Sequence, residues 1–571
     1  MIQKNVKSLL NFCNFPYTDK KDILSNIKCN FLFLISAIAF FCLYCSISDI
    51  WLLSPVVSTI VKIVSTVISI VFWVVIMSQC PSVSTFLKET PLSCKFFSVI
   101  SSSGICWYAA AEFYQKFELS LNTVSIFNNI PFNAYITRIT SISAALLSIY
   151  FVYTCTLFVL NKLLAEIKEA VKGIKSYEII IYAILICTTI TISVYGFSNS
   201  QAFWGTDYSG DIIYTSDSPE LVKGNAFINL LHPENDLRQP LFAVFSAPFM
   251  GAPYLIGKLL NVSLCVQALL NNAVQMILLC IAIFLISKML DLSPMKRICF
   301  IAISYSTYTF LLFSLMAEQY IIAFFWLSLT VYLISTKGES GYIVFCGTAG
   351  TLLTSVVFLP WTFSLQYKEL KARIYAMLKS GLVFIALILG FGRFDIFARI
   401  IPEIRVYALF TGKGVSIPNK LFQFTTFVKS CFMAPNAGIN VTTEEYPSWQ
   451  LLNPNSINWI GTFIILVAVL SFFINRRKKN TLIAGAWCLF SMVLLFILGW
   501  GTTENGLILY SLYFGWAYFV LLFQLIEAVE NKLKTKVLVP IFSVCAVAVL
   551  LWVNIPGICE LLNFAVSYYP V

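Results

Sequence analysis

The sequence predicts an all-α polytopic membrane protein with about 13–15 transmembrane or re-entrant helices and two long extracytoplasmic loops. Three observations lead to this expectation. Of the 571 residues, 59% are hydrophobic and only 11% are charged, whereas soluble domains carry about 25% charged residues. The apolar residues form continuous runs of roughly 17–25 residues, the length a helix needs to cross a bilayer. The runs lack the alternation of apolar and polar residues that a membrane β-barrel strand would show.

The apolar runs occur along the whole chain. They cover residues 29–49, 53–77, 96–114, 140–160, 177–198, 262–287, 298–315, 320–335, 341–358, 378–394, 457–474, 481–500, 508–528 and 537–555. Segment 241–257 is also apolar, but prolines and glycines interrupt it, so we expect an interfacial or re-entrant segment there. Residues 1–28 are polar and lack the features of a cleavable signal. The first helix is therefore expected to be an uncleaved anchor.

Lysine and arginine predict the orientation, because cytoplasmic segments carry an excess of both. They gather in segments 1–28, 162–175, 288–297 and 476–479. If these segments are cytoplasmic, residues 199–261 and 395–456 form the two long loops on the other side. The basic residues near 368–379 fit this orientation only if 341–366 enters the membrane and returns as a hairpin at Pro360.

The cysteines and the net charge exclude two other classes of protein. Most of the 17 cysteines fall inside apolar runs, where a thiol behaves as a small hydrophobic group. The pair Cys42 and Cys45 is a CxxC within the first run, which we interpret as packing. With His232 as the single histidine, we expect no Cys/His metal site. The net charge of +11 fits loops facing anionic lipid, and we expect no nucleic-acid partner.

The first long loop carries the densest group of acids in the chain. Its aromatic residues Trp204, Tyr208 and Tyr214 are interleaved with Asp207, Asp211, Asp217, Glu220, Glu234 and Asp236. Aromatic residues at such positions are typical of a membrane interface or a sugar site, although a plain solvated loop is an alternative. Residues 216–220 combine a helix N-cap with a proline in the first turn, which predicts a short surface helix ending near Gly224.

An acidic loop after a membrane helix, then a surface helix, then the segment Arg238-Gln-Pro-Leu-Phe242, resembles the GT-C class of membrane glycosyltransferases. The serotype-converting O-antigen glucosyltransferases and family 39-like enzymes are similar in layout. The resemblance covers residues 176–530. It leaves 1–175 as N-terminal membrane helices of unassigned role and 531–571 as a C-terminal helix and tail. It implies a GT-C-like fold in a bacterial inner membrane, with the active site facing the periplasm.

The resemblance also implies the reaction and the partners. A sugar would move from a polyprenyl-phosphate donor to a glycan or lipid-linked acceptor such as O-antigen or lipopolysaccharide, among membrane lipids. A loop aspartate would act as general base, since a sugar hydroxyl is a poor nucleophile and a positioned base contributes typically 10²–10⁴-fold. Asp207 best matches this position, and Asp211 and Asp217 are rivals. No cofactor is required by the pattern, and a divalent cation is left open.

Further residues are candidates for substrate binding. Arg238 suits a lipid phosphate, because arginine makes bidentate contacts with phosphate oxygens; a contact with headgroups is its alternative role. Glu318 lies at the outer end of a run, level with the first loop. The remaining candidates are Tyr208, Glu504, Tyr510 and Tyr513, and His232 is either a proton carrier or solvated.

Two other functions remain open. A transporter or flippase for a lipid-linked oligosaccharide would carry charges at the middle of its helices, but the apolar runs contain few. A polysaccharide polymerase or ligase would use arginines in outer loops. Such a role would draw on the cations of the second loop, which are Arg393, Arg399, Arg405, Lys413, Lys420 and Lys429.

Overall fold

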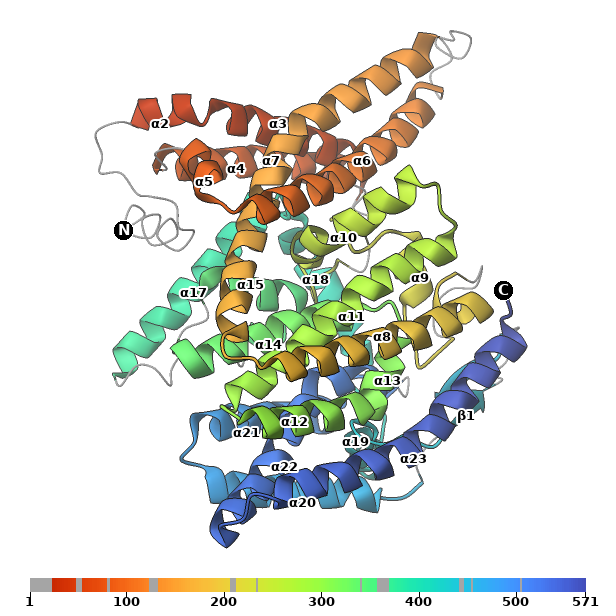
Figure 1. The fold of residues 1–571 in the computed structure, drawn as a ribbon. Helices are drawn as coiled ribbons and strands as arrows, with labels where there is room; N and C mark the ends of the chain where they lie inside the picture. Colours follow the sequence, from red (N-terminus) through yellow and green to blue (C-terminus); the bar gives the residue numbers. More distant parts are fainter. Residues whose placement is uncertain are drawn as a thin grey trace.

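The computed structural model describes residues 23–47, 54–79, 83–122, 132–205, 212–232, 235–338, 341–356, 369–440, 446–452, 455–503 and 506–571. Helices make up 80% of it. The N-terminal helices form one group, drawn in red and orange in Figure 1. They are α2 (Ile23–Cys29), α3 (Phe31–Ile47), α4 (Pro55–Gln79), α5 (Val83–Glu89), α6 (Leu92–Asn122) and α7 (Phe132–Val171).

The remaining elements pack against one side of this group and lie below it in Figure 1. The helices that follow α7 are α8 (Ser176–Asn199), α9 (Ser218–Lys223), α10 (Phe242–Leu259), α11 (Leu264–Met289), α12 (Pro294–Ser306), α13 (Tyr308–Ser314), α14 (Gln319–Lys337), α15 (Tyr342–Thr351), α17 (Leu370–Gly390), α18 (Asp395–Tyr407) and α19 (Ile417–Ser430). After them come α20 (Trp459–Asn475), α21 (Lys479–Ser491), α22 (Ser511–Leu533) and α23 (Leu538–Tyr568).

Short elements complete the fold. They are the 3₁₀ turns η1 (Gln201–Phe203), η2 (Ala408–Phe410) and η4 (Gly506–Tyr510), the π turn η3 (Met492–Ile497), and strands β1 (Ala437–Asn440) and β2 (Ser448–Leu451). The two strands pair antiparallel, with Ala437 opposite Leu451 and Asn440 opposite Ser448. They form a small hairpin between α19 and α20.

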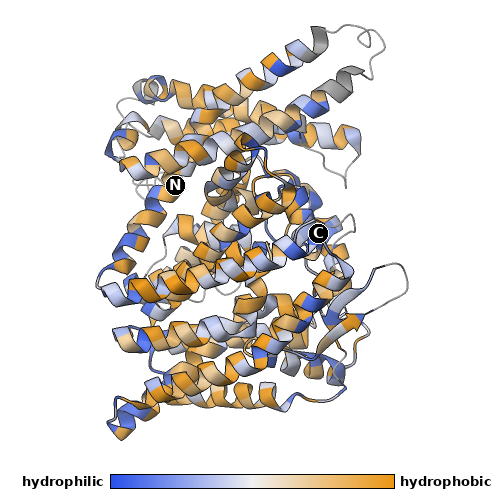
Figure 2. Ribbon diagram, turned by 45° about the vertical axis from the view of Figure 1, so that its right-hand side comes forward, coloured by the Kyte–Doolittle hydropathy of each residue, from blue (hydrophilic) through white to orange (hydrophobic). Residues whose placement is uncertain are grey.

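The helices have the length and composition of membrane spans. Among the described residues, ten helices are long and apolar enough to cross a membrane. The bent pair α12 and α13 adds one more if it is counted as a single span, and three shorter helices are also apolar. Figure 2 shows apolar residues along the length of most helices. The chain is a multi-pass, all-α membrane protein.

Three of the four basic segments that set the predicted orientation, 162–175, 288–297 and 476–479, lie at one end of the molecule. Lys337 Nζ lies 2.5 Å from Glu166 and 2.6 Å from Glu169. Lys288 Nζ donates to the carbonyl of Lys172 at 3.3 Å, which joins the end of α11 to the turn between α7 and α8. We call this end, formed by residues 162–178, 288–297, 334–337 and 478–480, the basic face.

The two long loops meet at the opposite end of α8 and α22. The amide of Gln201 donates to the carbonyl of Tyr569 at 2.9 Å, and that of Gly501 donates to Phe410 at 3.0 Å. We call this end, formed by residues 200–241, 408–452, 498–510 and 565–570, the loop face. That both loops are extracytoplasmic stays a prediction.

Segment 241–257 differs from its prediction, because α10 is one continuous helix that meets the length and composition of a span. The first long loop therefore ends near residue 241. Prolines 248 and 253 lie inside α10, and each removes a backbone donor. The Ser101 hydroxyl of α6 donates to the carbonyls of Ala247 and Pro248 at 2.9 and 3.0 Å. These two bonds attach α6 to α10 at the turn that contains Pro248.

Helices α6 and α10 approach each other through glycines. A Cβ added to Gly104 would overlap the carbonyl oxygen of Gly251, and one added to Gly251 would overlap Ser101. Small residues at a helix interface let the two backbones come close. The resulting van der Waals contacts stabilise the association of membrane helices. This contact fixes the N-terminal helices against the rest of the chain.

Helices α3 and α4 make a second contact, with the end of α17. The last carbonyls of a helix lack partners within the helix. Here Trp73 Nε1 donates to Gly390 at 2.7 Å, Ser69 donates to Leu389 at 2.9 Å, and Tyr44 donates to Gly392 at 3.3 Å. The N-terminal helices thus hold the turn that leads from α17 into α18.

We expect Gly104→Val to lower the thermal stability of the purified protein in detergent, because the added side chain must force α6 away from α10 at a typical cost of about 1–3 kcal/mol. Gly381→Ala is the matched control, since a Cβ at Gly381 meets no atom within 4 Å. Alanine in a helix interior stabilises relative to glycine, so this variant should melt at or above the wild-type temperature. If Gly104→Val and Gly381→Ala had the same melting temperature, the close contact between α6 and α10 would be contradicted.

Candidate functional site

The two loops of the loop face are joined by backbone pairing. Trp449 of β2 donates its amide to the carbonyl of Ile212 at 2.7 Å and accepts from the amide of Tyr214 at 2.9 Å. The described part of the first loop therefore adds a short parallel bridge to the β1–β2 hairpin. This pairing fixes where the first loop lies just before Asp217.

An aromatic clasp, formed by Tyr214, Tyr308 and Trp449, locks this pairing. The hydroxyls of Tyr214 and Tyr308 lie 2.7 Å apart, and the indole N–H of Trp449 donates to the Tyr214 hydroxyl at 3.1 Å. All three side chains are buried. Since buried tyrosine and tryptophan need such polar partners, the clasp ties both loops to the start of α13.

The acidic segment continues from the clasp into α9 and reaches the start of α14. Asp217 is the N-cap residue of α9, and Gly224 ends this helix, as the sequence predicts. The Ser218 hydroxyl donates to Glu318 Oε1 at 3.0 Å. Glu318, the residue before α14, has no exposed surface. The prediction that Glu318 lies level with the first loop is confirmed by this contact.

Helix α11 holds Glu318 from the other side. Gln275 Nε2 donates to the Glu318 carbonyl and Gln275 Oε1 accepts from the Glu318 amide, both at 3.1 Å. One turn earlier, Asn272 Nδ2 donates to the carbonyls of Ser314 and Met316 at 3.3 and 3.2 Å. These bonds support the break between α13 and α14. The polar positions inside the apolar run 262–287 were a signal of this site that the sequence reasoning missed.

Three tyrosines form a cluster on the α14 and α22 side of this carboxylate. The ring of Tyr320 lies 5.0 Å from Tyr513 and 6.0 Å from Tyr510, measured between centroids. Trp500 Nε1 donates to the Tyr510 hydroxyl at 2.8 Å. Tyr513 is buried and interacts electrostatically with Glu318. Among the described residues, the Tyr513 hydroxyl has no hydrogen-bond partner.

Arg238 lies beside these tyrosines, with its guanidinium between an acid and an aromatic ring. Its Nε donates to Asp236 at 2.8 Å, and its Cζ lies 5.5 Å from the centroid of the Tyr407 ring. Arg238 also interacts electrostatically with Tyr513. Its side chain is 38% exposed, whereas Asp236 is 11% exposed. The arginine is thus oriented by its neighbours and still open to solvent or ligand.

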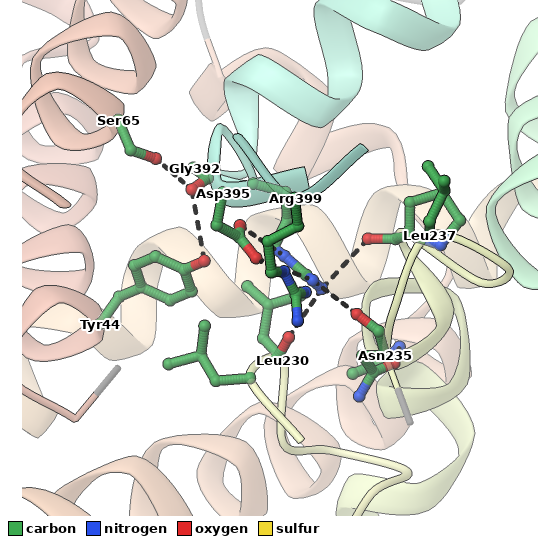
Figure 3. A network of polar contacts seen from close by, with 12 residues as sticks. Tyr44, Ser65, Leu230, Asn235, Leu237, Gly392, Asp395 and Arg399 are labelled. Carbon is green, nitrogen blue, oxygen red and sulfur yellow. Dashed lines mark hydrogen bonds and ion pairs between the residues drawn. The ribbon is translucent and has the colours of Figure 1, made fainter. Parts of the chain in front are cut away.

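A buried charge network lies at the junction of α17 and α18 (Figure 3). Arg393 Nε lies 3.0 Å from Asp395, and the other nitrogens of Arg393 donate to the carbonyls of Leu230, Asn235 and Pro240 at 2.5–3.1 Å. Its guanidinium has no exposed surface. Arg393 therefore fixes the fold of residues 230–240, which carry Arg238.

The network continues along one face of α18. Arg399 lies 3.0 Å from Asp395 and 3.2 Å from Glu403, both at four-residue spacing. Glu403 Oε2 also accepts from the Leu237 amide at 2.8 Å. The structure does not support the hypothesis that Arg393 and Arg399 serve a polymerase or ligase as exposed loop cations. Both guanidinium groups turn inward, where Asp395 and Glu403 neutralise them.

The other predicted site residues divide into two sets. Asp207, Tyr208, Asp211 and Glu504 lie outside the described residues. Asp217, Arg238, Glu318 and Tyr510 all come together at the loop face around Tyr320 and Tyr513, with Asp217 in electrostatic range of Tyr320. In the described part of the chain, no group of three or more His, Cys, Asp or Glu side chains could hold a metal ion.

His232 is packed inside the first loop. Its ring fills the space that a Cβ on Gly224 would need, at the end of α9. Burial lowers the pKa of His232 from its usual 6.5 to about 4, so the imidazole is neutral at pH 7. This is the environment of a structural side chain at the turn after α9.

No family model, curated protein or solved structure matches this chain. The chemistry of the loop face is therefore inferred from its geometry and from the residues that it brings together.

We expect Arg393→Met to destabilise the protein strongly, because removing one partner of a buried ion pair typically costs about 3–5 kcal/mol. It would leave Asp395 with Arg399 as its remaining partner and would remove the side-chain donor from the carbonyls of Leu230, Asn235 and Pro240. Arg405→Met on the exposed side of α18 is the control, and its effect should stay within about 0.5 kcal/mol. The measurement is thermal unfolding in detergent, and equal losses in the two variants would refute the role of Arg393.

We expect His232 to make stability depend on pH. Because its folded pKa lies below the unfolded value, the unfolded state binds more protons between these two values. The full stability is present above about pH 6.5 and decreases as the pH falls toward 4. The melting temperature of His232→Gln should therefore decrease less than that of the wild type between pH 7 and 5. Parallel curves would show that His232 is not desolvated.

Proposed function

We propose that the protein is a membrane glycosyltransferase that moves a sugar from a polyprenyl-phosphate carrier to a glycan or lipid-linked acceptor. The observation that carries the proposal is the buried Glu318 carboxylate at the loop face, bonded to Ser218 beside the acidic first loop. Tyrosines and an exposed arginine lie next to it. The site therefore contains an acid, aromatic surfaces and a cation. These are the groups that a sugar and a lipid phosphate require.

The reaction needs a base and a group that stabilises the leaving phosphate. The acceptor hydroxyl oxygen bonds to the anomeric carbon, and the bond from that carbon to the phosphate oxygen breaks. A loop carboxylate, with Asp207 first and Asp211 and Asp217 as rivals, takes the hydroxyl proton. Polyprenyl phosphate leaves with the electron pair, and a guanidinium such as Arg238 stabilises its charge.

The tyrosine cluster supports a polar ligand at the same place. A buried hydroxyl without a partner is costly, and the Tyr513 hydroxyl has none among the described residues. A sugar hydroxyl or phosphate oxygen would supply one. Tyr320 and Tyr510 offer ring faces next to it. In this proposal Glu318 orients the bound substrate through hydrogen bonds.

The distribution of charge favours this reaction over the two alternatives. A ligase that used loop arginines would need them exposed, but of Arg393, Arg399 and Arg405 only Arg405 is exposed. The other two are neutralised by Asp395 and Glu403. A transporter would carry its ionisable groups along the middle of its spans. In α8, α11 and α14 the charged residues lie in the terminal turns, at Glu178, Lys288 and Lys337, and Glu318 is the residue before α14.

We expect purified protein, given polyprenyl-phosphate glucose and a lipid-linked glycan acceptor, to release polyprenyl phosphate. Asp207→Asn should lower the rate about 100-fold or more, because a general base contributes at least that factor. Glu318→Gln should also lower the rate. Glu220→Gln is the matched control: Glu220 lies on α9 two residues after Ser218, but it is exposed, so the rate of this variant should be unchanged.

Two outcomes would contradict the proposal. Release that is unaffected by Asp207→Asn, Asp211→Asn and Asp217→Asn would remove the loop carboxylates as bases. Movement of the carrier-linked sugar across sealed vesicles without bond cleavage would identify a transporter instead. The melting curve of each variant shows whether a loss of activity comes from removal of the base or from unfolding of the protein.

A further inference from the structure

A cavity of about 160 Å³ lies between the N-terminal helices and the rest of the protein. One wall is formed by α3, α4, α6 and α7, and includes Phe33, Trp73 and Phe151. The other wall is formed by α10, α15, α17 and residues 228–230, and includes Ala243 and Leu387. The cavity separates two hydrophobic clusters of the protein, one in the N-terminal helices and one in the remainder.

The lining excludes water as the occupant. Among the described residues, Thr154 and Thr156 are the only lining residues with a hydroxyl side chain, and the Thr154 hydroxyl already donates to the carbonyl of Tyr150. The indole N–H of Trp73 is bonded to Gly390. A buried water needs two to four polar partners, and apolar cavities of about 150 Å³ stay dry and accept a ring-sized hydrocarbon. Only an apolar occupant fits these walls.

An empty space of this size would weaken the contact between the two groups of helices. Protein interiors are close-packed, and few voids exceed the size of a water molecule. Lining atoms that face a void lose their dispersion contacts. A hydrocarbon in the cavity would restore these contacts across the interface.

The position of the cavity identifies the source of the hydrocarbon. Its walls include four helices with the properties of membrane spans, α4, α7, α10 and α17. The outer faces of α4 and α17 expose apolar side chains such as Val71 and Leu382, which are suited to lipid. Phe40, Val159 and Leu387 on the lining are half-buried, so the apolar surface continues from the cavity outward.

We propose that this cavity binds an acyl chain of a membrane phospholipid. The chain completes the packing between the N-terminal helices and the α10–α17 side of the molecule. It lies next to Phe391, one residue before the turn at Gly392 that α3 and α4 hold. The site does not depend on the proposed sugar transfer.

The test uses the full-length protein purified in mild detergent with a phosphatidylethanolamine that carries a photoreactive diazirine on its acyl chain. Peptides from the cavity wall, for example those with Phe245 or Phe391, should be labelled. Val152→Phe places a larger side chain on a buried position of the wall. It should reduce this labelling about tenfold, since excluding two or more methylene groups corresponds to that ratio. Val71→Phe, on the exposed face of α4, should leave it unchanged.

A second variant and a competition experiment complete the test. Ala243→Leu fills the cavity from the α10 wall and should give the same loss, which guards against a folding defect specific to Val152→Phe. Unlabelled phosphatidylethanolamine should compete for the site. The absence of wall labelling in the wild type, or labelling that neither cavity variant reduces, would overturn the proposal. Competition by polyprenyl phosphate alone would also overturn it, because the occupant would then be the tail of the carrier.

Discussion

The buried guanidinium of Arg393 is the interaction on which the arrangement of the loop face depends. A charge without exposed surface is tolerable only when it is paired and hydrogen-bonded, and Arg393 meets this condition with Asp395 and three backbone carbonyls of residues 230–240. Those partners come from segments about 160 residues apart in the chain. The loop that carries Arg238, the end of α17 and the start of α18 therefore hold a single relative position.

The N-terminal helices extend this constraint. Their side chains bind the last carbonyls of α17 and the turn at Gly392, directly before Arg393. Their glycine contact with α10 holds the helix that directly follows residues 230–241. Residues before 175, which have no counterpart in the GT-C resemblance, thus support the region that bears the candidate site. This gives them a physical role without requiring that they touch a substrate.

Glu318 shows the same principle in a different setting. Its backbone is held by Gln275 and its carboxylate by Ser218, so a break between two apolar helices becomes a fixed acidic position. The aromatic clasp then brings the second loop against the first. A site made of several chain segments acquires a defined shape because each polar group buried near the membrane must find a partner.

The sequence by itself determined the class of the protein and most of its helices, because a backbone in hydrocarbon must satisfy its hydrogen bonds within each segment. It also located α9, whose N-cap and proline act locally. It did not predict α10 as a continuous helix, because prolines such as Pro248 and Pro253 usually interrupt helices, whereas α10 is continuous and packs closely against α6 at Gly104 and Gly251. Only the tertiary structure decided that Arg393 and Arg399 face inward and that Glu318, Arg238 and Tyr513 share one site. Ion pairs and loop contacts join residues that are far apart in the sequence. The pattern along the chain therefore shows which polar side chains the protein has, but not which of them contact each other.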